Sequence, residues 1–510
     1  LQRDANGQIL GTKYGLSESR TKNLFFKSAY AFDVNRGLQL TYNYYEAQQN
    51  ANLVDVVNSV NTGEPTYAIR PSSPLNDPGA PQGPRGNKNL MIKYTDTSLF
   101  EQTQMTLDYY DQLIENVFFF SPTLSNPDEG YEGGQSMIKS EKSGLRAVFN
   151  TDVLWQEFDA QFIYGLDALN DVTSQPLLDG RLWVPEMDMN NLAGFLQTKW
   201  TFDQHWVVKA GLRHEKIDLT VDDYRTLRLC RNENTCSIPI DVTGGELNYT
   251  ATTYNIGLRY NRHPEFSPFI SYSEGADISD LGRLLRTATV SDISLIRTEA
   301  SIIDHYEIGA TSQFDKFKLE YAAYLSRSEL GTTNRYDADT GVYMPVRAPQ
   351  KIWGAELSLD YRITDNLNLV TSYSWVEGKN EETNEYLGGK QIAAPKMTAQ
   401  LNWQAMDDFA LSLRYLNVFD RQRFEQENGE WVGDQGPVEQ YQVFNLSGRY
   451  WLDNTVTGDS AIGNTELFFG IENLLNNDYY PAKSQVYTYS GYNVKGMGRT
   501  VNLGVKVYFN

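Results

Sequence analysis

Long apolar runs, cysteine and histidine are scarce in this chain of 510 residues. No run of about 18 apolar residues occurs, which excludes helices that span a membrane. Two Cys and 4 His leave little material for a metal or redox centre. Acidic residues outnumber basic ones by 65 to 44, and the net charge is -21. This balance argues against a nucleic-acid surface, which requires clustered Lys and Arg.

Catalytic motifs are also missing from the sequence. His205 and His263 fall in short predicted turns, His214 falls on a strand, and His305 begins another. None of them shares a face with a suitable Ser and Asp, and no Gly-x-Ser-x-Gly motif occurs. We therefore predict that the protein is not an enzyme and that it carries neither a catalytic residue nor a bound metal.

A two-residue alternation of apolar and polar side chains runs through the whole chain, and 13% of the residues are aromatic. Residues 38–45, 254–260, 355–361 and 501–509 are clear examples. Strands point successive side chains to opposite faces, so each segment has one apolar and one polar face. The pattern fits either a soluble antiparallel sheet or a transmembrane barrel with lipid outside and a wet lumen inside.

Three features favour an all-β transmembrane antiparallel β-barrel. The segments are about 10 residues or longer, which is enough to cross a bilayer when tilted. Aromatic residues lie near segment ends, as interfacial girdles require. Connections alternate between short turns and long polar loops, which places the long loops outside the cell. The aromatic residues are Tyr109, Tyr110, Trp200, Trp206, Tyr479 and Tyr480, and the long loops are 49–87, 121–136, 171–190, 221–249, 275–300, 380–393, 425–438 and 480–495.

The strand count predicts that part of the barrel is missing. We count about 19 strands, from near 22–32 to near 496–509, whereas bacterial barrels use even numbers. The first and last strands both run toward the periplasm, which leaves residues 1–21 as an external loop remnant and 22–510 as barrel. The first strands and anything before them are then absent from a barrel of about 22 strands. The alternative is a missed strand in 1–21, where Ile9–Tyr14 is weakly apolar.

Three loops and the charged strand positions carry the other predictions. Loop 49–87 holds six Pro and should not pair with other strands in a β-ladder.

Cys230 and Cys236 lie in one external loop, and export through an oxidising compartment favours a disulfide between them. Loop 275–300 has leucines at helical spacing with Arg283 and Arg286 among them. It is either a surface helix over the barrel mouth or a lid whose guanidinium groups bind an anionic ligand.

The inward-facing charges either pair in the lumen or line a solute path; they are Lys209, Arg213, Arg259, Glu356, Asp360 and Lys506.

The C-terminal region resembles TonB-dependent outer-membrane receptors. Residues 471–480 read IENLLNNDYY, similar to the family signature before the final strand, with Leu475 in place of Phe. Residues 496–500 match the family's Gly-x-Gly-Arg-Thr start of that strand. The matching positions are Glu472, Asn473, Leu474, Tyr479, Tyr480, Gly496, Gly498 and Arg499. Within the family, the pattern is most similar to siderophore receptors of the ferric aerobactin type.

This resemblance implies a function in binding and uptake at the bacterial outer membrane. It implies a ferric siderophore of hydroxamate or citrate type as ligand, with iron only in the bound chelate and no cofactor. The family's N-terminal plug, which couples to the TonB–ExbB–ExbD complex, is not found here, in agreement with the strand count. Arg283, Arg286 and Arg297 are the candidate contacts to an anionic chelate. A passive porin, or a receptor of the same family for a vitamin or sugar, are the alternatives.

Overall fold

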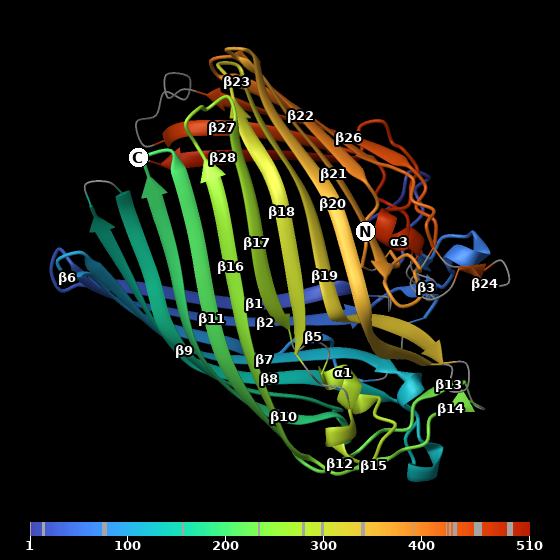
Figure 1. Ribbon diagram of the computed structural model, residues 1–510. Helices are drawn as coiled ribbons and strands as arrows, with labels where there is room; N and C mark the ends of the chain where they lie inside the picture. Colours follow the sequence, from blue (N-terminus) through green and yellow to red (C-terminus); the bar gives the residue numbers. More distant parts are fainter. Residues whose placement is uncertain are drawn as a thin grey trace.

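The structure is a computed structural model, and it describes residues 2–12, 16–73, 79–155, 158–232, 235–277, 281–296, 300–337, 342–389, 391–424, 426–427, 430–431, 436–452, 462–486 and 493–509. In this part of the chain, strands dominate and follow one another as a curved wall (Figure 1).

The long strands are β1 (Leu16–Ala31), β2 (Arg36–Ala51), β6 (Asn87–Phe100), β7 (Thr103–Ser121), β8 (Gly134–Leu154), β9 (Phe158–Pro176), β10 (Leu182–Phe202), β11 (Trp206–Val221), β16 (Gly245–Tyr260), β17 (Ser267–Asp277), β18 (Ser301–Gln313), β19 (Phe317–Asp337), β20 (Val342–Thr364), β21 (Leu367–Asn380), β22 (Lys396–Met406), β23 (Phe409–Val418), β26 (Tyr441–Leu452), β27 (Ile462–Glu472) and β28 (Thr500–Phe509). The short strands are β3 (Val54–Val56), β4 (Tyr67–Ile69), β5 (Gly83–Pro84), β12 (Tyr224–Arg225), β13 (Cys230–Asn232), β14 (Thr235–Cys236), β15 (Asp241–Val242), β24 (Gln426–Glu427) and β25 (Glu430–Trp431). The helices are α1 (Leu281–Arg286), α3 (Ala482–Val486) and single 3-10 turns at Val60–Thr62, Pro122–Leu124, Pro127–Glu129 and Ile293–Leu295.

One antiparallel sheet of 20 strands joins all the long strands and the two-residue β5. Each long strand pairs with the next one along the chain, as in β1 with β2 and β27 with β28. The nineteen long strands match the predicted number. Strand β1 begins at Leu16, earlier than predicted, so residues 16–21 belong to the sheet. In the described part of the chain β1 and β28 are its edges, so the sheet does not close there.

Connections alternate between two ends of the sheet, which we call the turn end and the loop end. Residues 32–35, 203–205 and 407–408 are typical of the turn end, and 222–244 and 473–499 are typical of the loop end. The prediction that residues 171–190 form a long loop is wrong. Strands β9 and β10 continue through most of it, and only 177–181 connect them.

The Pro-rich stretch 49–87 also differs from the prediction. Strands β3 and β4 form a small hairpin within it, and Gly83–Pro84 pairs with Val117 and Asn116 of β7. Proline lacks only the N–H group, so a two-residue strand can include it where that donor is not needed. The prediction that this stretch joins no ladder is therefore wrong.

The two faces of the sheet differ sharply in polarity. One face, which we call the apolar face, exposes large aliphatic side chains, with Leu166, Leu192, Ile256, Ile308 and Leu503 each more than half exposed. Exposing so much aliphatic surface to water is unfavourable by about 25 cal/mol per Å², so this face is suited to lipid. The described helices include none that is long and apolar enough to cross a membrane.

Aromatic rings gather on the apolar face at the turn end. Trp200 stacks on Trp155 with ring centroids 6.4 Å apart, and Trp206 contacts Tyr260 at 4.5 Å. This is where interfacial girdles occur in transmembrane barrels. The prediction that aromatic residues near segment ends form a girdle is wrong for Tyr110, because its ring packs against Gly144 on the opposite, polar face.

Candidate ligand-binding site

The connection between β17 and β18 folds back onto the polar face of the sheet. Its helix α1 packs on β10, and Leu285 is fully buried in a cluster with Leu219 and Val221. The hydroxyl of buried Tyr224 donates a hydrogen bond of 2.8 Å to the carbonyl oxygen of Leu285. Burial raises the pKa of Tyr224 to about 12. The helix is thus fixed to the wall.

Two hydrogen bonds explain where this short helix ends, and a third begins the 3-10 turn that follows it. The backbone N–H and the hydroxyl of Thr287 both donate to the carbonyl oxygen of Arg283, at 3.1 and 2.7 Å. Asp292 then accepts a hydrogen bond of 2.8 Å from the Ser294 N–H and begins the 3-10 turn. A six-residue helix is marginal alone, so packing of its apolar side holds it.

A cavity of about 550 Å³ lies between α1 and the polar face of β8–β11 and β16. Arg283 and Arg286 both line it, so the structure places these two predicted residues beside one cavity. The Arg286 guanidinium also lies 4.5 Å from the centre of the Trp183 ring. The third candidate, Arg297, lies outside the described residues. The role of all three in ligand binding stays a prediction.

Most of the cavity wall is apolar, in contrast to the rest of this face. Met187, Met189, Ile217 and Leu219 line it from β10 and β11. Its polar side includes Lys142 of β8, whose Nζ lies 2.8 Å from a carboxylate oxygen of Asp171. The cavity therefore offers cationic groups together with an apolar surface.

Toward the turn end, the polar face carries a ladder of opposite charges. Asp167 accepts from the Arg146 Nε at 2.6 Å and from the Arg213 Nη1 at 2.8 Å, and Arg213 also contacts Glu215 at 3.3 Å. Ala193 of β10 lies opposite both acidic residues and leaves room for Arg213 to reach across. Of the two alternatives for the inward-facing charges, pairing on the polar face describes Arg213 in this structure.

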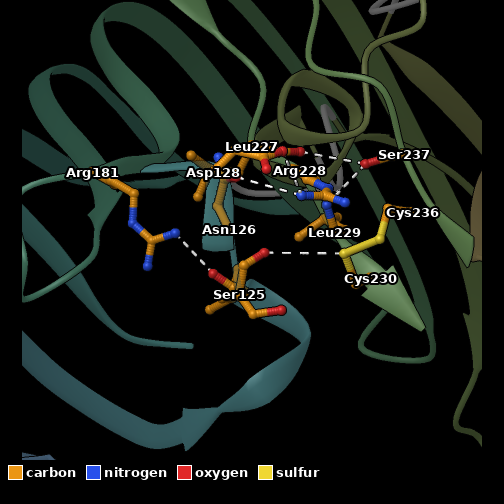
Figure 2. Close-up of a disulfide and its surroundings, with 11 residues drawn as sticks. Ser125, Asn126, Asp128, Arg181, Leu227, Arg228, Leu229, Cys230, Cys236 and Ser237 are labelled. Carbon is orange, nitrogen blue, oxygen red and sulfur yellow. Dashed lines mark hydrogen bonds and ion pairs between the residues drawn. A yellow bond between two sulfur atoms is a disulfide. The ribbon is translucent and has the colours of Figure 1, made fainter. Parts of the chain in front are cut away.

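The disulfide predicted from the sequence is present between Cys230 and Cys236 (Figure 2). It closes the β13–β14 hairpin, which lies against residues 122–133. Arg228 contacts the Asp128 carboxylate at 3.3 Å, and the Cys230 sulfur lies 4.0 Å from the Ser125 carbonyl oxygen. A disulfide sulfur carries no proton, so the second contact is packing and not a hydrogen bond. The hairpin therefore packs onto the neighbouring connection.

Arg181, at the tip of the β9–β10 hairpin, also contacts the 122–133 connection. Its guanidinium donates to the carbonyl oxygens of Leu124 at 2.8 Å and Gly133 at 2.6 Å, and it lies 3.9 Å from the centre of the Tyr131 ring. Burial raises the pKa of Asp179, but hydrogen bonds from Arg181 outweigh burial and lower it. Sequence reasoning missed this clamp, although the Asp179-Gly180 pair is a signal for a tight hairpin turn.

A second buried clamp lies at the loop end of β21. Arg421 and Glu377 have side chains only 1% and 4% exposed, and the Arg421 Nε lies 3.3 Å from the carboxylate. Arg421 also donates to the Leu387 carbonyl oxygen at 2.8 Å and lies over the Phe424 ring. Removing one partner of such a pair typically costs about 3–5 kcal/mol. Arg421 therefore joins residues 419–424 to β21 through Glu377 and to the following connection through Leu387, and no sequence motif marked it.

Residues 472–474 of the C-terminal signature make hydrogen bonds that organise the connection between β27 and β28. Asn473 is 2% exposed, and its amide donates to the carbonyl oxygens of Asn477 and Met497, both at 2.9 Å. Its backbone has a φ of 47°, a left-handed conformation that Asn tolerates. Glu472 ends β27 and Leu474 donates its N–H to the Phe444 carbonyl oxygen. This network holds the two ends of the last connection together.

The glycines of the signature permit close approaches. A Cβ on Gly496 would lie within 3 Å of the Tyr479 ring, and one on Gly498 would meet the Asp4 backbone. Tyr479 lies in the 473–499 connection, and its ring stacks on that of Tyr441 in β26. The prediction that Tyr479 belongs to a membrane girdle is therefore wrong. Tyr480 lies in the same connection, outside the strands, and its place in a girdle stays a prediction. Arg499 donates its backbone N–H to the Asn476 side chain at 2.9 Å.

Comparison with known proteins adds a family and relatives to this geometry. A family model described as "TonB dependent receptor-like, beta-barrel" matches residues 3–474. Ferric aerobactin receptors of Klebsiella pneumoniae and Escherichia coli are each 25% identical to this chain, covering 99% of it and 72% of the relative. The solved structure of the copper transporter OprC has a similar fold, with a TM-score of 0.75 at 14% identity over 100% of this chain and 76% of that one.

Proposed function

Because the chain belongs to the TonB-dependent receptor-like β-barrel family, we propose that it is a bacterial outer-membrane receptor that takes up a ferric siderophore of the hydroxamate or citrate type. Proteins of this family are receptors and transporters, not enzymes, so the function is binding and transport without chemistry on the ligand. A passive porin, the alternative from another class, does not belong to this family.

The cavity beneath α1 is the observation that carries this proposal. In a chain of net charge -21, one cavity on the polar face is lined by Arg283, Arg286 and Lys142, with Asp171 as the partner of Lys142. Guanidinium groups match the geometry of carboxylates and bind them with paired, charge-assisted hydrogen bonds. A ferric chelate with citrate carboxylates supplies such groups. The printed names of the curated relatives, which are ferric aerobactin receptors, support the same ligand class.

In the proposed mechanism, loops at the loop end capture the chelate on the outside of the cell. A plug then couples the receptor to TonB–ExbB–ExbD and opens the path inward. The sheet is then part of a closed barrel of about 22 strands embedded in outer-membrane lipid. Within the described residues β1 pairs only with β2 and β28 only with β27, and these two edges, together with the greater length of the relatives, support this architecture.

We also propose that residues preceding β1 lie on the external side, with the barrel domain extending to residue 510. Gly498 donates its N–H to the Arg3 carbonyl oxygen at 2.8 Å, and Asn6 contacts Asp478 at 3.1 Å. Both contacts join the N-terminal segment to the long connection 473–499, which is at the loop end.

Uptake of radioactive iron tests the proposal. The full-length receptor is expressed in iron-starved cells that lack their own ferric siderophore receptors. Cells are supplied with a ferric complex of a citrate-based dihydroxamate, with and without TonB. We expect saturable uptake only when both receptor and TonB are present. Uptake that persists without TonB would favour a passive channel. No uptake, with TonB-dependent uptake of cobalamin or an oligosaccharide instead, would favour another ligand of the family.

A further inference from the structure

The wall of the α1 cavity is unusual for its place in the molecule. On the same face, a short distance toward the turn end, Arg146, Asp167 and Arg213 form continuous ion pairs. Inside the cavity, by contrast, Ile217 and Leu219 are less than a tenth exposed, and Leu219 also belongs to the apolar cluster on which α1 packs. Packing of α1 accounts for the part of this surface beneath the helix, whereas the part that lines the cavity is open to a ligand.

Two methionines on the open side of the cavity add to the apolar surface. Met187 and Met189 alternate on β10 and both line the cavity. Their side chains have three rotatable bonds and a polarisable sulfur, so they adapt to chains of irregular shape. Gly282 of α1 also lines the cavity, and a Cβ there would lie 3.2 Å from Val184. The helix therefore lies close over the strand beside the two methionines.

Cationic groups stand at the boundary of this apolar surface. Arg283 and Arg286 project from α1, and Lys142 lies on the opposite wall with its partner Asp171. A ligand that fits both parts must have an anionic group joined to a hydrocarbon segment. A chelate that is polar throughout leaves the apolar wall without a partner.

Resting on the proposed function, we infer that the preferred ligand is an amphiphilic ferric chelate. Its carboxylate-bearing head lies against Arg283 and Arg286, and an aliphatic arm enters the cavity against Met189, Ile217 and Leu219. Each methylene that leaves water for the cavity strengthens binding by about fourfold, until the cavity is full.

Affinity along a series of chain lengths is the direct test. The probes are gallium complexes of one citrate-based dihydroxamate that carries no acyl chain, or a butanoyl, octanoyl or dodecanoyl chain. Binding to the full-length receptor in lipid nanodiscs is measured by competition with the radioactive ferric complex of the chain-free compound. We expect affinity to rise by at least about tenfold from the chain-free to the octanoyl compound and then to level off.

Two variants separate cavity binding from partition of the chain into lipid. Met189→Trp fills the cavity without altering a charge, and Met91→Trp places the same side chain on β6, which does not line the cavity. We expect Met189→Trp to remove most of the gain from the octanoyl chain and to leave chain-free binding within about threefold. Met91→Trp should preserve the gain.

If Met189→Trp fails to fold, Leu219→Ala supplies the opposite change, because a larger cavity shifts the levelling point toward longer chains. Equal affinity across the series, with intact binding of the chain-free compound, overturns the amphiphilic ligand and leaves the siderophore receptor standing. If the octanoyl chain raises affinity equally in all variants, the rise comes from partition of the chain into lipid, and the amphiphilic ligand is again overturned. Failure of every ferric probe to bind or enter cells contradicts the proposed function itself.

Discussion

At the scale of single residues, Arg181 shows how one guanidinium joins distant segments. It contacts carbonyl oxygens at both ends of the 122–133 connection and is neutralised by Asp179. The pairing is local in sequence, but its targets are about fifty residues away and follow only from the fold. The Asp-Gly turn was readable in the sequence, whereas the bound carbonyl groups were not.

The Arg181–Asp179 pair predicts acid-sensitive packing of residues 122–133. The folded pKa of Asp179 lies below its unfolded value, so the ionised carboxylate stabilises the clamp at neutral pH. This contribution, on the order of 1 kcal/mol, is lost as pH falls below about 4 through the folded pKa. Hydrogen exchange, corrected for intrinsic rates, should show protection of 122–133 falling in that window. Asp179→Asn should be less protected already at neutral pH and respond little to acid.

Asp241→Asn is the matched control, because Asp241 is exposed and pairs at 3.7 Å with exposed Arg225. It should leave exchange of 122–133 unchanged. Acid dependence of the same size in Asp179→Asn and the unmodified receptor would contradict the assignment.

The two arginines of α1 give a prediction at the same scale. Replacing both Arg283 and Arg286 with Ala should weaken binding of a citrate-type ferric chelate by roughly a hundredfold or more, since a hydrogen bond to a charged group contributes about 1.5–3 kcal/mol. Titration of the purified full-length receptor measures this. Arg225→Ala removes an exposed arginine of a neighbouring connection and should bind normally. An unchanged affinity in the double variant would remove both residues from the site.

At the scale of elements, alternation predicted most strands but not their ends. Strand β9 continues into the mostly polar residues 171–176, where the two-residue pattern fades, and β10 begins already at Leu182, in a segment whose Val184, Met187 and Met189 pack beneath α1. The short helix α1 was predicted from its leucine spacing. Its position on β10 and β11 depends on contacts with Leu219 and Val221, which lie some sixty residues away, so the cavity was not predictable.

The disulfide hairpin predicts a local and not a global effect. The loop closed by Cys230 and Cys236 is short, so the bond stabilises it by about 2 kcal/mol in the chain-entropy model. Replacing both cysteines with Ser should speed hydrogen exchange in residues 225–242 and in the facing 122–133 connection. The exchange of β10 and β11 should not change, because their ladders do not depend on the hairpin. Faster exchange throughout the sheet would refute this local role.

At the scale of the whole molecule, strand direction limits how the sheet can close. Strand β1 is followed by the short connection 32–35 and β28 is preceded by the long connection 473–499, so both run toward the turn end. Direct pairing of these edges would be parallel, in a sheet whose pairs are otherwise all antiparallel. Antiparallel closure needs an odd number of further strands. The sequence alone predicted this parity because the alternation of short and long connections is visible without coordinates.

Cross-linking in the full-length receptor tests the three-strand gap. Cysteines at Phe469 and Leu503, which are direct partners on β27 and β28, should form a disulfide in the assembled protein. Cysteine at Leu503 combined in turn with cysteine at Leu24, Phe26 or Ser28 of β1 should not, because three intervening strands place the edges about 19 Å apart, beyond the roughly 7 Å limit for a disulfide. Efficient cross-linking of any β1–β28 pair would mean that the nineteen strands close on themselves, which would contradict a barrel of 22.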